Sequence, residues 1–301
     1  MRKPTKRVGV GVSAALVALT LVCSACKAET STPELSLEEA RANNDSRLVA
    51  DQFRQPIRVL HDKSGLESVA MFFDSSDTMI IAEDSPAAQL RGASLAISQH
   101  APMLTYDKTL HRDIISMVEN LGVKRAVTIG DVSIASTDGE YLVFKDPMTE
   151  KSLGELTAFD FDTRVVGDKN EAVRAVAALE PHERIELVPG WGSDHEVDEL
   201  SERKESAKVP ALPAQSRRDG QMAPVIVATP NTSLVSVANA RSYGGNVKVL
   251  DSGNPADSKE SFKQVVGLGQ GPLIALGEDF VSSRELTARI ADAEEKFAKA
   301  H

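Results

Sequence analysis

The stretches TMIIAEDSPAAQLRGASLAISQHAPMLTYD (Thr78–Asp107) and PVIVATPNTSLVSVANARSYGGNVKVLDS (Pro224–Ser252) decide the fold, because both follow one pattern. Each opens on a short apolar run, MIIA or VIVA, that is typical of a buried strand. A helix-start signal follows, Ser85 before a proline in the first stretch and Asn231-Thr232 in the second. Apolar positions at helical spacing then lead to a second short strand, PMLT or VKVL. We therefore predict a strand–helix–strand unit in each stretch.

The parallel between the two stretches continues beyond them. A second helical stripe closes at Gly122 in the first copy and at Gly267 in the second, and a third strand follows each. These strands, RAVTIGDVSIAS and PLIALGEDFVSS, match at a constant offset that pairs Gly130 with Gly277. Parallel strands with crossover helices imply layered α/β architecture. The predicted fold class is α/β, with two Rossmann-like βαβαβ repeats, parallel sheets and a less regular α+β middle segment.

The segment between the repeats has a weaker pattern. GEYLVF and LTAFDFDTRVV alternate like strands, with Asp138-Gly139 as a turn signal, NEAVRAVAALE is helical and RIELVP resembles a strand. This segment is either a degenerate third α/β unit or an insertion. The predicted organisation is a signal peptide (1–25), a lipidated tether with an N-terminal helix (26–55), the first repeat (56–136), the middle segment (137–193), an exposed linker (194–223) and the second repeat with a C-terminal helix (224–301).

The N-terminus has the features of an exported lipoprotein. Basic residues precede an apolar run of about 15 residues, Val8–Val22, which suits a signal-peptide core and is short for a membrane span. Cys26 follows Ser24-Ala25, small residues of the kind that precede a lipidated cysteine, whereas Cys23 follows a bulky valine. We predict lipidation (palmitate included) at Cys26 and anchoring at the outer face of the cell membrane. An ordinary secretory signal is the alternative, and a CxxC redox motif fits poorly because no βαβ pattern surrounds it.

The charge of the predicted mature chain limits its partners. Removal of residues 1–25 leaves 276 residues, in which a core rather than disulfides has to provide stability. The 34 basic residues fall to 30 while all 44 acidic residues stay, so the net charge is −14. Such a charge repels nucleic acid, which we do not expect as a partner.

Two segments of the first repeat, LRGASLAISQHAPMLTYD and ENLGVKRAVTIGDVSIAS, carry a family resemblance. Their order of Ala/Leu-rich helix, Pro-Ile-Leu-Leu-Thr-like strand and Leu-Gly-Val helix end resembles the cell wall-binding repeat 2 family of bacterial surface proteins. The second repeat follows this order loosely, with GGNVKVLD at the strand. Ala88-Gln89-Leu90 replaces the usual Asp-Ala-Leu, the Arg-Tyr signature is absent, and two repeats are legible where members often have three. The resemblance implies non-catalytic attachment to cell-envelope polymers, often anionic ones.

Attachment of an acidic chain to an anionic polymer requires a local basic patch. The candidates all lie in the first repeat: Arg91, Lys108, His111, Arg112, Lys124 and Arg125. They need not share a surface, because Lys124-Arg125 begins a strand and Lys108 begins a helix. The alternative is that these charges are solvated at the ends of secondary-structure elements.

Trp191 is the chain's single tryptophan and a second kind of binding candidate. Its two flanking glycines would leave the ring face accessible for stacking on a sugar, and the alternative is that the ring is a local hydrophobic anchor. The glycines of VVGLGQG (Val265–Gly271) end a helix rather than begin one, so we predict a C-cap and tight turn, not a phosphate loop.

No nucleophile, metal or cofactor motif is legible, and we predict no enzyme activity, no metal and no cofactor. The leading hypothesis is a non-catalytic envelope lipoprotein that binds cell-wall polymer. The alternative is a small-solute or sugar-binding lipoprotein with its ligand between two α/β halves, and a wall hydrolase is a third class. The sequence does not fix the oligomeric state.

Overall fold

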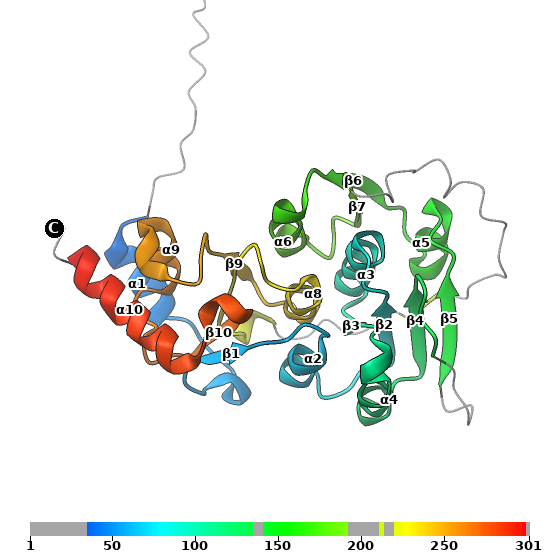
Figure 1. Cartoon of the computed structure of the whole chain (residues 1–301), viewed down its shortest axis with the longest axis horizontal. Helices are drawn as coiled ribbons and strands as arrows, with labels where there is room; N and C mark the ends of the chain where they lie inside the picture. The colour runs from blue at the N-terminus through cyan, green and yellow to red at the C-terminus, as the bar shows by residue number, and fades with distance from the viewer. Residues whose placement is uncertain (1–34, 135–140, 192–210, 214–219, 299–301) are drawn as a thin grey trace, which may run out of the picture. The chain divides into compact units, whose positions relative to one another are not determined.

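The computed structural model describes residues 35–134, 141–191, 211–213 and 220–298. They belong to a compact unit, Leu35–His301, so a chain that begins at Leu35 contains the whole described fold. The strands are parallel and lie in three sheets, which confirms the predicted α/β class (Figure 1).

The first repeat forms the predicted βαβαβ unit. Its elements are β2 (Thr78–Ala82), α3 (Pro86–Gln99), β3 (Met103–Thr105), α4 (His111–Asn120) and β4 (Arg125–Ile129). β2 is buried at every residue because β3 and β4 flank it, in the order β3-β2-β4. A continuous apolar strand in the centre of a parallel sheet is what the run MIIA predicts.

The second repeat forms an equivalent unit. Its elements are β8 (Val225–Ala228), α8 (Leu234–Tyr243), β9 (Val247–Val249), α9 (Lys259–Val265) and β10 (Leu273–Leu276). The strand order β9-β8-β10 matches β3-β2-β4, so the internal repeat is confirmed at the level of topology. The N-cap of α8 is Ser233, just after the predicted start signal.

Gly130 and Gly277 end the third strand of each repeat, as their matched positions predict. Both have positive φ, 83° and 112°. A Cβ on Gly130 would lie 2.2 Å from the Glu83 carboxylate, and a Cβ on Gly277 would lie 2.9 Å from Thr232 Oγ1. Each glycine therefore allows the loop after the repeat's first strand to pass close to the end of the third strand.

A fourth strand completes the sheet of each of the two repeats and crosses the predicted domain boundaries. β5 (Leu142–Asp146), which we assigned to the middle segment, pairs with β4, and β1 (Arg58–Leu60), which we assigned to the first repeat, pairs with β10. The boundaries at 56 and 136 are therefore wrong, because each third strand had an open edge that a neighbouring segment fills. The turn signal Asp138-Gly139 lies outside the described residues.

The middle segment contains a third α/β unit. β6 (Asp162–Val166), α6 (Lys169–Ala178) and β7 (Ile185–Pro189) form a parallel βαβ unit, which favours the degenerate repeat over an insertion. In the first two repeats, 20 to 24 positions separate the end of the second strand from the start of the third. At the same distance after β7, a third strand of the middle unit would begin within 209–213, VPALP. The two prolines of this stretch have no backbone N–H to donate to a neighbouring strand. Its described part, 211–213, is not a strand.

The remaining described helices lie before, between or after the strand–helix units, and short 3-10 turns connect neighbouring elements. They are α1 (Leu37–Asp45), α2 (Leu66–Phe72), α5 (Glu150–Thr157), α10 (Ser283–Ala298) and the 3-10 turns Asp51–Phe53, Lys108–Leu110, Gly220–Met222, Pro255–Asp257 and Glu278–Phe280. In α10, the predicted C-terminal helix, Leu286 and Ile290 are buried, and Phe297 stacks on Phe262 with ring centroids 5.3 Å apart. α5 was missed because its Thr149 capping box lies between the two stretches, GEYLVF and LTAFDFDTRVV, that we assigned to strands.

Two smaller predictions have opposite outcomes. Val265 is the last residue of α9 and Gly267 has a φ of 84°, so the glycine-rich stretch is the predicted helix end and turn. The description of 194–223 as an exposed linker is wrong for its described parts, 211–213 and 220–223, because Leu212 and Ala223 are buried. The Leu212 N–H donates to the Leu156 carbonyl oxygen at 2.7 Å, which fixes the segment on α5.

The first helices of the three units, α3, α6 and α8, pack on one another (Figure 1). Each also packs against the second strand of a different unit: α3 against β7, α6 against β9, and α8 against β3. The three units thus interlock in a closed cycle. The same helical position makes the polar link each time, since Arg91, Arg174 and Asn239 are each the sixth residue after their N-cap.

Candidate functional site

The carboxyl ends of strands from all three sheets lead to one place. The loops after β2, β6 and β8 run directly into the first turns of α3, α6 and α8, whose N-caps are Ser85, Asp168 and Ser233. In both complete repeats the first strand has the second strand on one side and the third on the other, so the chain leaves neighbouring strands in opposite directions. Open parallel sheets bind ligands at the carboxyl ends of such strands.

A cavity of about 560 Å³ lies at these strand ends. Its lining comes from the loop after β1, the first turns of α3, α6 and α8, the end of β3 and the residue that follows Gly190. The polar and aromatic members are Lys63, Asp84, Ser85, Gln89, Thr105, Lys169, Asn170, Trp191, Asn231, Thr232 and Ser233. This volume is within the range of about 300–1,000 Å³ that small-molecule sites occupy.

Hydrogen bonds within the protein hold several of these side chains in place. The Gln89 amide nitrogen donates to the Glu83 carbonyl oxygen and to Thr105 Oγ1, both at 3.0 Å. Thr232 Oγ1 donates to the Leu276 carbonyl oxygen at 2.7 Å. A lining fixed in this way loses little conformational entropy when a ligand binds.

The charged groups of the cavity are few and mixed in sign. Lys63 and Lys169 are cationic, and Asp84 is anionic. Lys63 forms an exposed ion pair with Glu278 at 2.9 Å, which reduces its excess charge. Asn231, which also lines the cavity, donates from Nδ2 to Asp279 Oδ2 at 3.1 Å. Amides and hydroxyls predominate, a lining that suits a neutral polyhydroxy ligand better than a strongly charged one.

Trp191 lies at the cavity and also packs on the protein. It follows Gly190, where a Cβ would lie 2.8 Å from the Val166 carbonyl oxygen, so the chain can turn there only with glycine. The indole is half-buried, contacts the larger hydrophobic core and lines the cavity. Packing, one of the two predicted roles, is confirmed, and stacking on a sugar stays a prediction.

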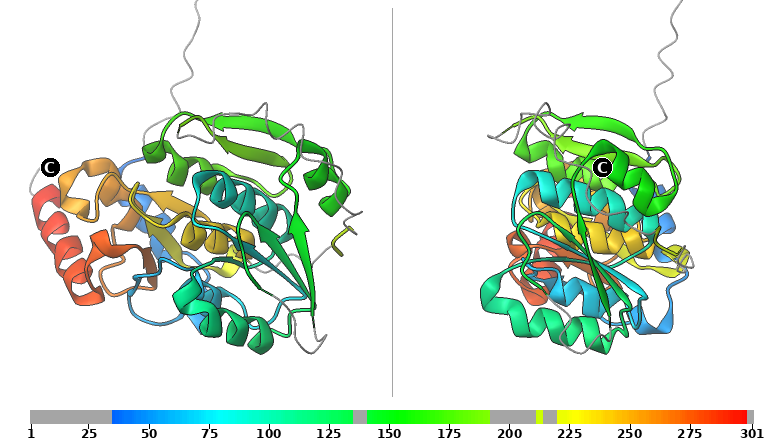
Figure 2. Two further views of the ribbon diagram at one scale, coloured as in Figure 1. Left: turned by 45° about the vertical axis from the view of Figure 1, so that its right-hand side comes forward. Right: turned by 90° about the vertical axis from the view of Figure 1, so that its right-hand side faces the viewer.

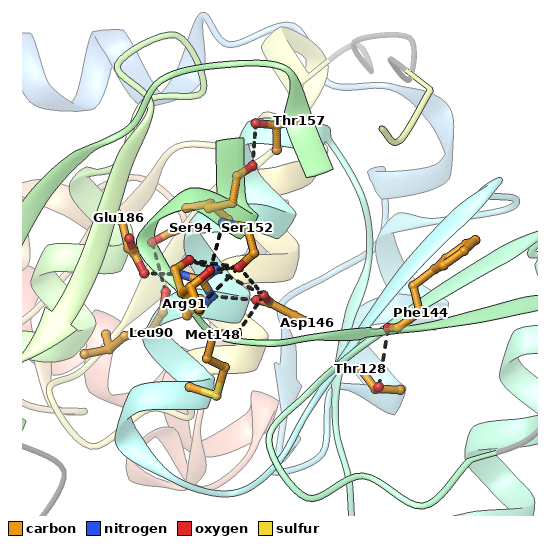
Figure 3. A network of polar contacts seen from close by, with 12 residues as sticks. Leu90, Arg91, Ser94, Thr128, Phe144, Asp146, Met148, Ser152, Thr157 and Glu186 are labelled. Carbon is orange, nitrogen blue, oxygen red and sulfur yellow. Dashed lines mark hydrogen bonds and ion pairs between the residues drawn. The ribbon is translucent and has the colours of Figure 1, made fainter. Parts of the chain in front are cut away.

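Arg91, the first of the predicted polymer-binding cations, is buried and ion-paired (Figure 3). Its Nε donates to Asp146 Oδ2 at 2.5 Å and its Nη2 donates to Asp146 Oδ1 at 3.1 Å. Nη2 also donates to Ser152 Oγ at 2.8 Å and to the Thr149 carbonyl oxygen at 2.9 Å, and Nη1 donates to Glu186. The guanidinium therefore joins α3 to β5, α5 and β7, and the prediction that Arg91 binds a ligand is wrong.

Two opposing effects act on the Arg91 guanidinium. Burial disfavours the charged form, but the hydrogen bond and charge of Asp146, with those of Glu186, outweigh it and raise the pKa of Arg91. The arginine is thus a permanent cation that pairs with two carboxylates. Its role is to hold the first repeat and the middle unit together.

The remaining basic candidates do not form one surface. Lys108 and Arg112 are exposed beyond the carboxyl end of β3, whereas Lys124 and Arg125 stand at the amino end of β4. Because the strands are parallel, these two groups lie at opposite ends of the strands of the sheet. Lys124 Nζ donates to Asp77 Oδ1 at 2.7 Å, and this bond lowers the pKa of Asp77. The predicted basic patch is therefore wrong as a single site.

One sequence signal could have identified the Arg91 cluster. α3 has Arg91 as its one charged residue among alanines, leucines and serines, and all but a few of its side chains are buried. A lone charge in such a helix has to be paired. Its partners Asp146 and Glu186 lie 55 and 95 positions away, so no local pattern names them.

Cys26 and the part of the chain between Ser193 and Val209 lie outside the described residues. None of the described helices has the length and apolarity needed to cross a membrane. The described residues also contain no group of three or more His, Cys, Asp or Glu side chains placed to hold a metal ion. No protein-family model, curated protein or solved structure matches the chain.

Proposed function

We propose that the protein is a non-catalytic, lipid-anchored envelope protein that binds a saccharide in the central cavity. The main observation behind this proposal is that residues at the strand ends of all three units line one cavity of about 560 Å³. A cavity built by three units depends on their common fold rather than on one variable loop. This proposal develops the predicted sugar-binding alternative.

The chemistry of the lining supports a saccharide. Trp191 offers an aromatic surface, and amide and hydroxyl side chains such as Gln89, Asn231 and Thr232 offer donors and acceptors at positions fixed by hydrogen bonds within the protein. Sugars have apolar ring faces and hydroxyl rims, so they use both kinds of group.

Cell-wall polymer is the second candidate, and it shares this chemistry because wall polymers contain sugars. The resemblance to the cell wall-binding repeat 2 family supports it, and the middle α/β unit brings the number of units to three, although the third strand of that unit is missing among the described residues. The separation of the basic residues weighs against recognition by charge alone. A polymer would instead insert one sugar unit into the cavity.

The test is binding of the chain from Leu35 to soluble mono- and disaccharides by calorimetry, and to purified cell-wall sacculi by co-sedimentation. Asn231→Ala changes the cavity rim, and Asn43→Ala, at an exposed position of α1, is its matched control. We expect saturable binding that Asn231→Ala weakens by about tenfold, the effect of one or two lost hydrogen bonds. Binding to sacculi alone would identify the polymer as the source, and equal binding by both variants would contradict the proposal.

The lipid anchor is tested separately. Cys26→Ser removes the thiol that would carry the lipid, so we expect this variant in the soluble fraction and the unchanged protein in the membrane fraction. Equal distribution of both forms would contradict lipidation at Cys26.

A further inference from the structure

β6 is the outer strand of the smallest sheet and has one open edge. It pairs with β7 and with no other strand among the described residues, and β7 is the strand nearer to α3 (Figure 2). The corresponding strands β2 and β8 are flanked on both sides. Asp162, Thr163, Arg164 and Val165 are all exposed, and Val165 exposes 62% of its surface. Open strand edges with exposed apolar side chains are sites of pairing with another chain.

The backbone hydrogen bonds show which residues face the open edge. Asp162 N–H donates to the Arg184 carbonyl oxygen, and Gly190 N–H donates to the Val166 carbonyl oxygen. Even-numbered residues therefore point their backbone groups at β7. Because these groups alternate along a strand, Thr163 and Val165 point theirs at the open edge.

We propose that β6 pairs antiparallel with β6 of a second copy about a two-fold axis at Thr163. Because the backbone groups of odd-numbered residues face the open edge, an odd-numbered residue of one copy has to lie opposite an odd-numbered residue of the other. This leaves few possible registers. Centring on Thr163 places Asp162 opposite the second copy's Arg164, and Phe161 opposite its Val165. The strand is thus self-complementary in charge and in apolar character, as a two-fold interface requires.

Neighbouring registers place like charges together. A shift in one direction puts Asp162 opposite itself, and a shift in the other puts Arg164 opposite itself. In the chosen register the Asp–Arg pairs occupy non-hydrogen-bonded positions, where side chains approach most closely. Neither side chain has an ion-pair partner within the described residues of its own chain. Among the described strands β5 also has an open outer edge, but its charged residues Lys145 and Asp146 are adjacent, so the same alternation never places them opposite each other.

The test is sedimentation velocity of the chain from Leu35 over a range of concentrations and salt. We expect a monomer–dimer equilibrium that weakens with salt. Arg164→Asp and Asp162→Arg should each weaken the dimer by at least about tenfold, since each creates two like-charge pairs. The double variant with both changes should restore the dimer. These side chains are exposed, so unchanged urea midpoints will show that folding is intact.

A monomer at every concentration would overturn the proposal, as would a dimer that survives Arg164→Asp or a double variant that stays monomeric. The register has its own check, because the chain from Leu35 contains no cysteine. Thr163→Cys should form a disulfide-linked dimer on mild oxidation, since the two Cα atoms would lie about 5.5 Å apart. Leu142→Cys, an exposed residue on β5, is the matched control that should stay uncrosslinked.

Discussion

Arg91, Asn239 and Arg174 occupy the same position in the first helices of the three units, yet they use different chemistry. Arg91 is buried and forms ion pairs with two buried carboxylates. Asn239 is buried and neutral, and it bonds to both backbone groups of Met103. Arg174 is exposed and contacts the Val249 carbonyl oxygen and Asp251. The comparison indicates that the position on the helix determines which unit the side chain contacts. We expect burial to determine how much that contact contributes to the free energy of unfolding.

The contacts also protect strand edges. Asn239 accepts from Met103 N–H at 2.7 Å and donates to its carbonyl oxygen at 2.9 Å, on the open edge of β3. Ser94 Oγ accepts from Leu187 N–H at 2.9 Å on β7. Side chains of one unit thus satisfy backbone groups that a further strand would otherwise pair. The cycle of units therefore covers the second-strand edges, and the edge of β6 is outside this arrangement.

The largest expected effect is that of Arg91→Met. The change leaves Asp146 and Glu186 buried without their counter-charge, which costs about 3–5 kcal/mol in the free energy of unfolding. The urea midpoint of the chain from Leu35 measures it. Arg112→Ala, an exposed control, should change that free energy by less than about 0.5 kcal/mol. A similar small change for Arg91→Met would contradict the role of the buried ion pairs.

Asn239→Ala should have the second effect. Met103 N–H and its carbonyl oxygen would lose their partner in a buried place, at a cost of about 1–3 kcal/mol. Asn43→Ala is the matched exposed control for the same urea experiment. If Asn239→Ala proved neutral, water would have to reach the β3 edge, and the packing of α8 on β3 would be looser than described.

Arg174→Ala should have a smaller effect, although the residue occupies the equivalent position. The side chains of Arg174 and Asp251 are 49% and 65% exposed, so their ion pair contributes at most about 1 kcal/mol. We expect this contribution to disappear in high salt. A loss as large as that of Arg91→Met would show that position, not burial, determines the energy.

The smallest effect concerns pH and Lys124. The hydrogen bond from Lys124 lowers the pKa of Asp77 in the folded protein. A lowered folded-state pKa stabilises the fold above the unfolded-state pKa, and this contribution is lost as pH falls through the folded-state pKa. Lys124→Met should therefore reduce stability slightly at neutral pH and not in acid. An equal deficit at both pH values would contradict the pairing.

The repeats were predictable because apolar periodicity, helix caps and matched glycines are local signals. The partners of the strands were not, since β1 pairs with a strand more than 200 positions away in sequence, and local patterns do not encode such distances. The site shows the same division. Trp191 was found from its flanking glycines, whereas Gln89, Asn170 and Asn231 come to line one cavity only when three units pack together.

The prediction of a basic patch was wrong for a related reason. Charge alone does not distinguish Arg91, which lies in the interior, from Arg112, which is exposed. The surrounding composition does, because the residues of α3 are almost all small or apolar.

The most direct test of saccharide binding in the central cavity is the fluorescence of Trp191, since the chain contains one tryptophan. Soluble saccharides and solubilised wall fragments would be titrated into the chain from Leu35 while the emission spectrum is recorded. A saturable change in emission, weakened by Asn231→Ala and unchanged by Asn43→Ala, is the predicted result. Calorimetric binding of the same saccharide with no change in Trp191 emission would place the ligand elsewhere and contradict the account.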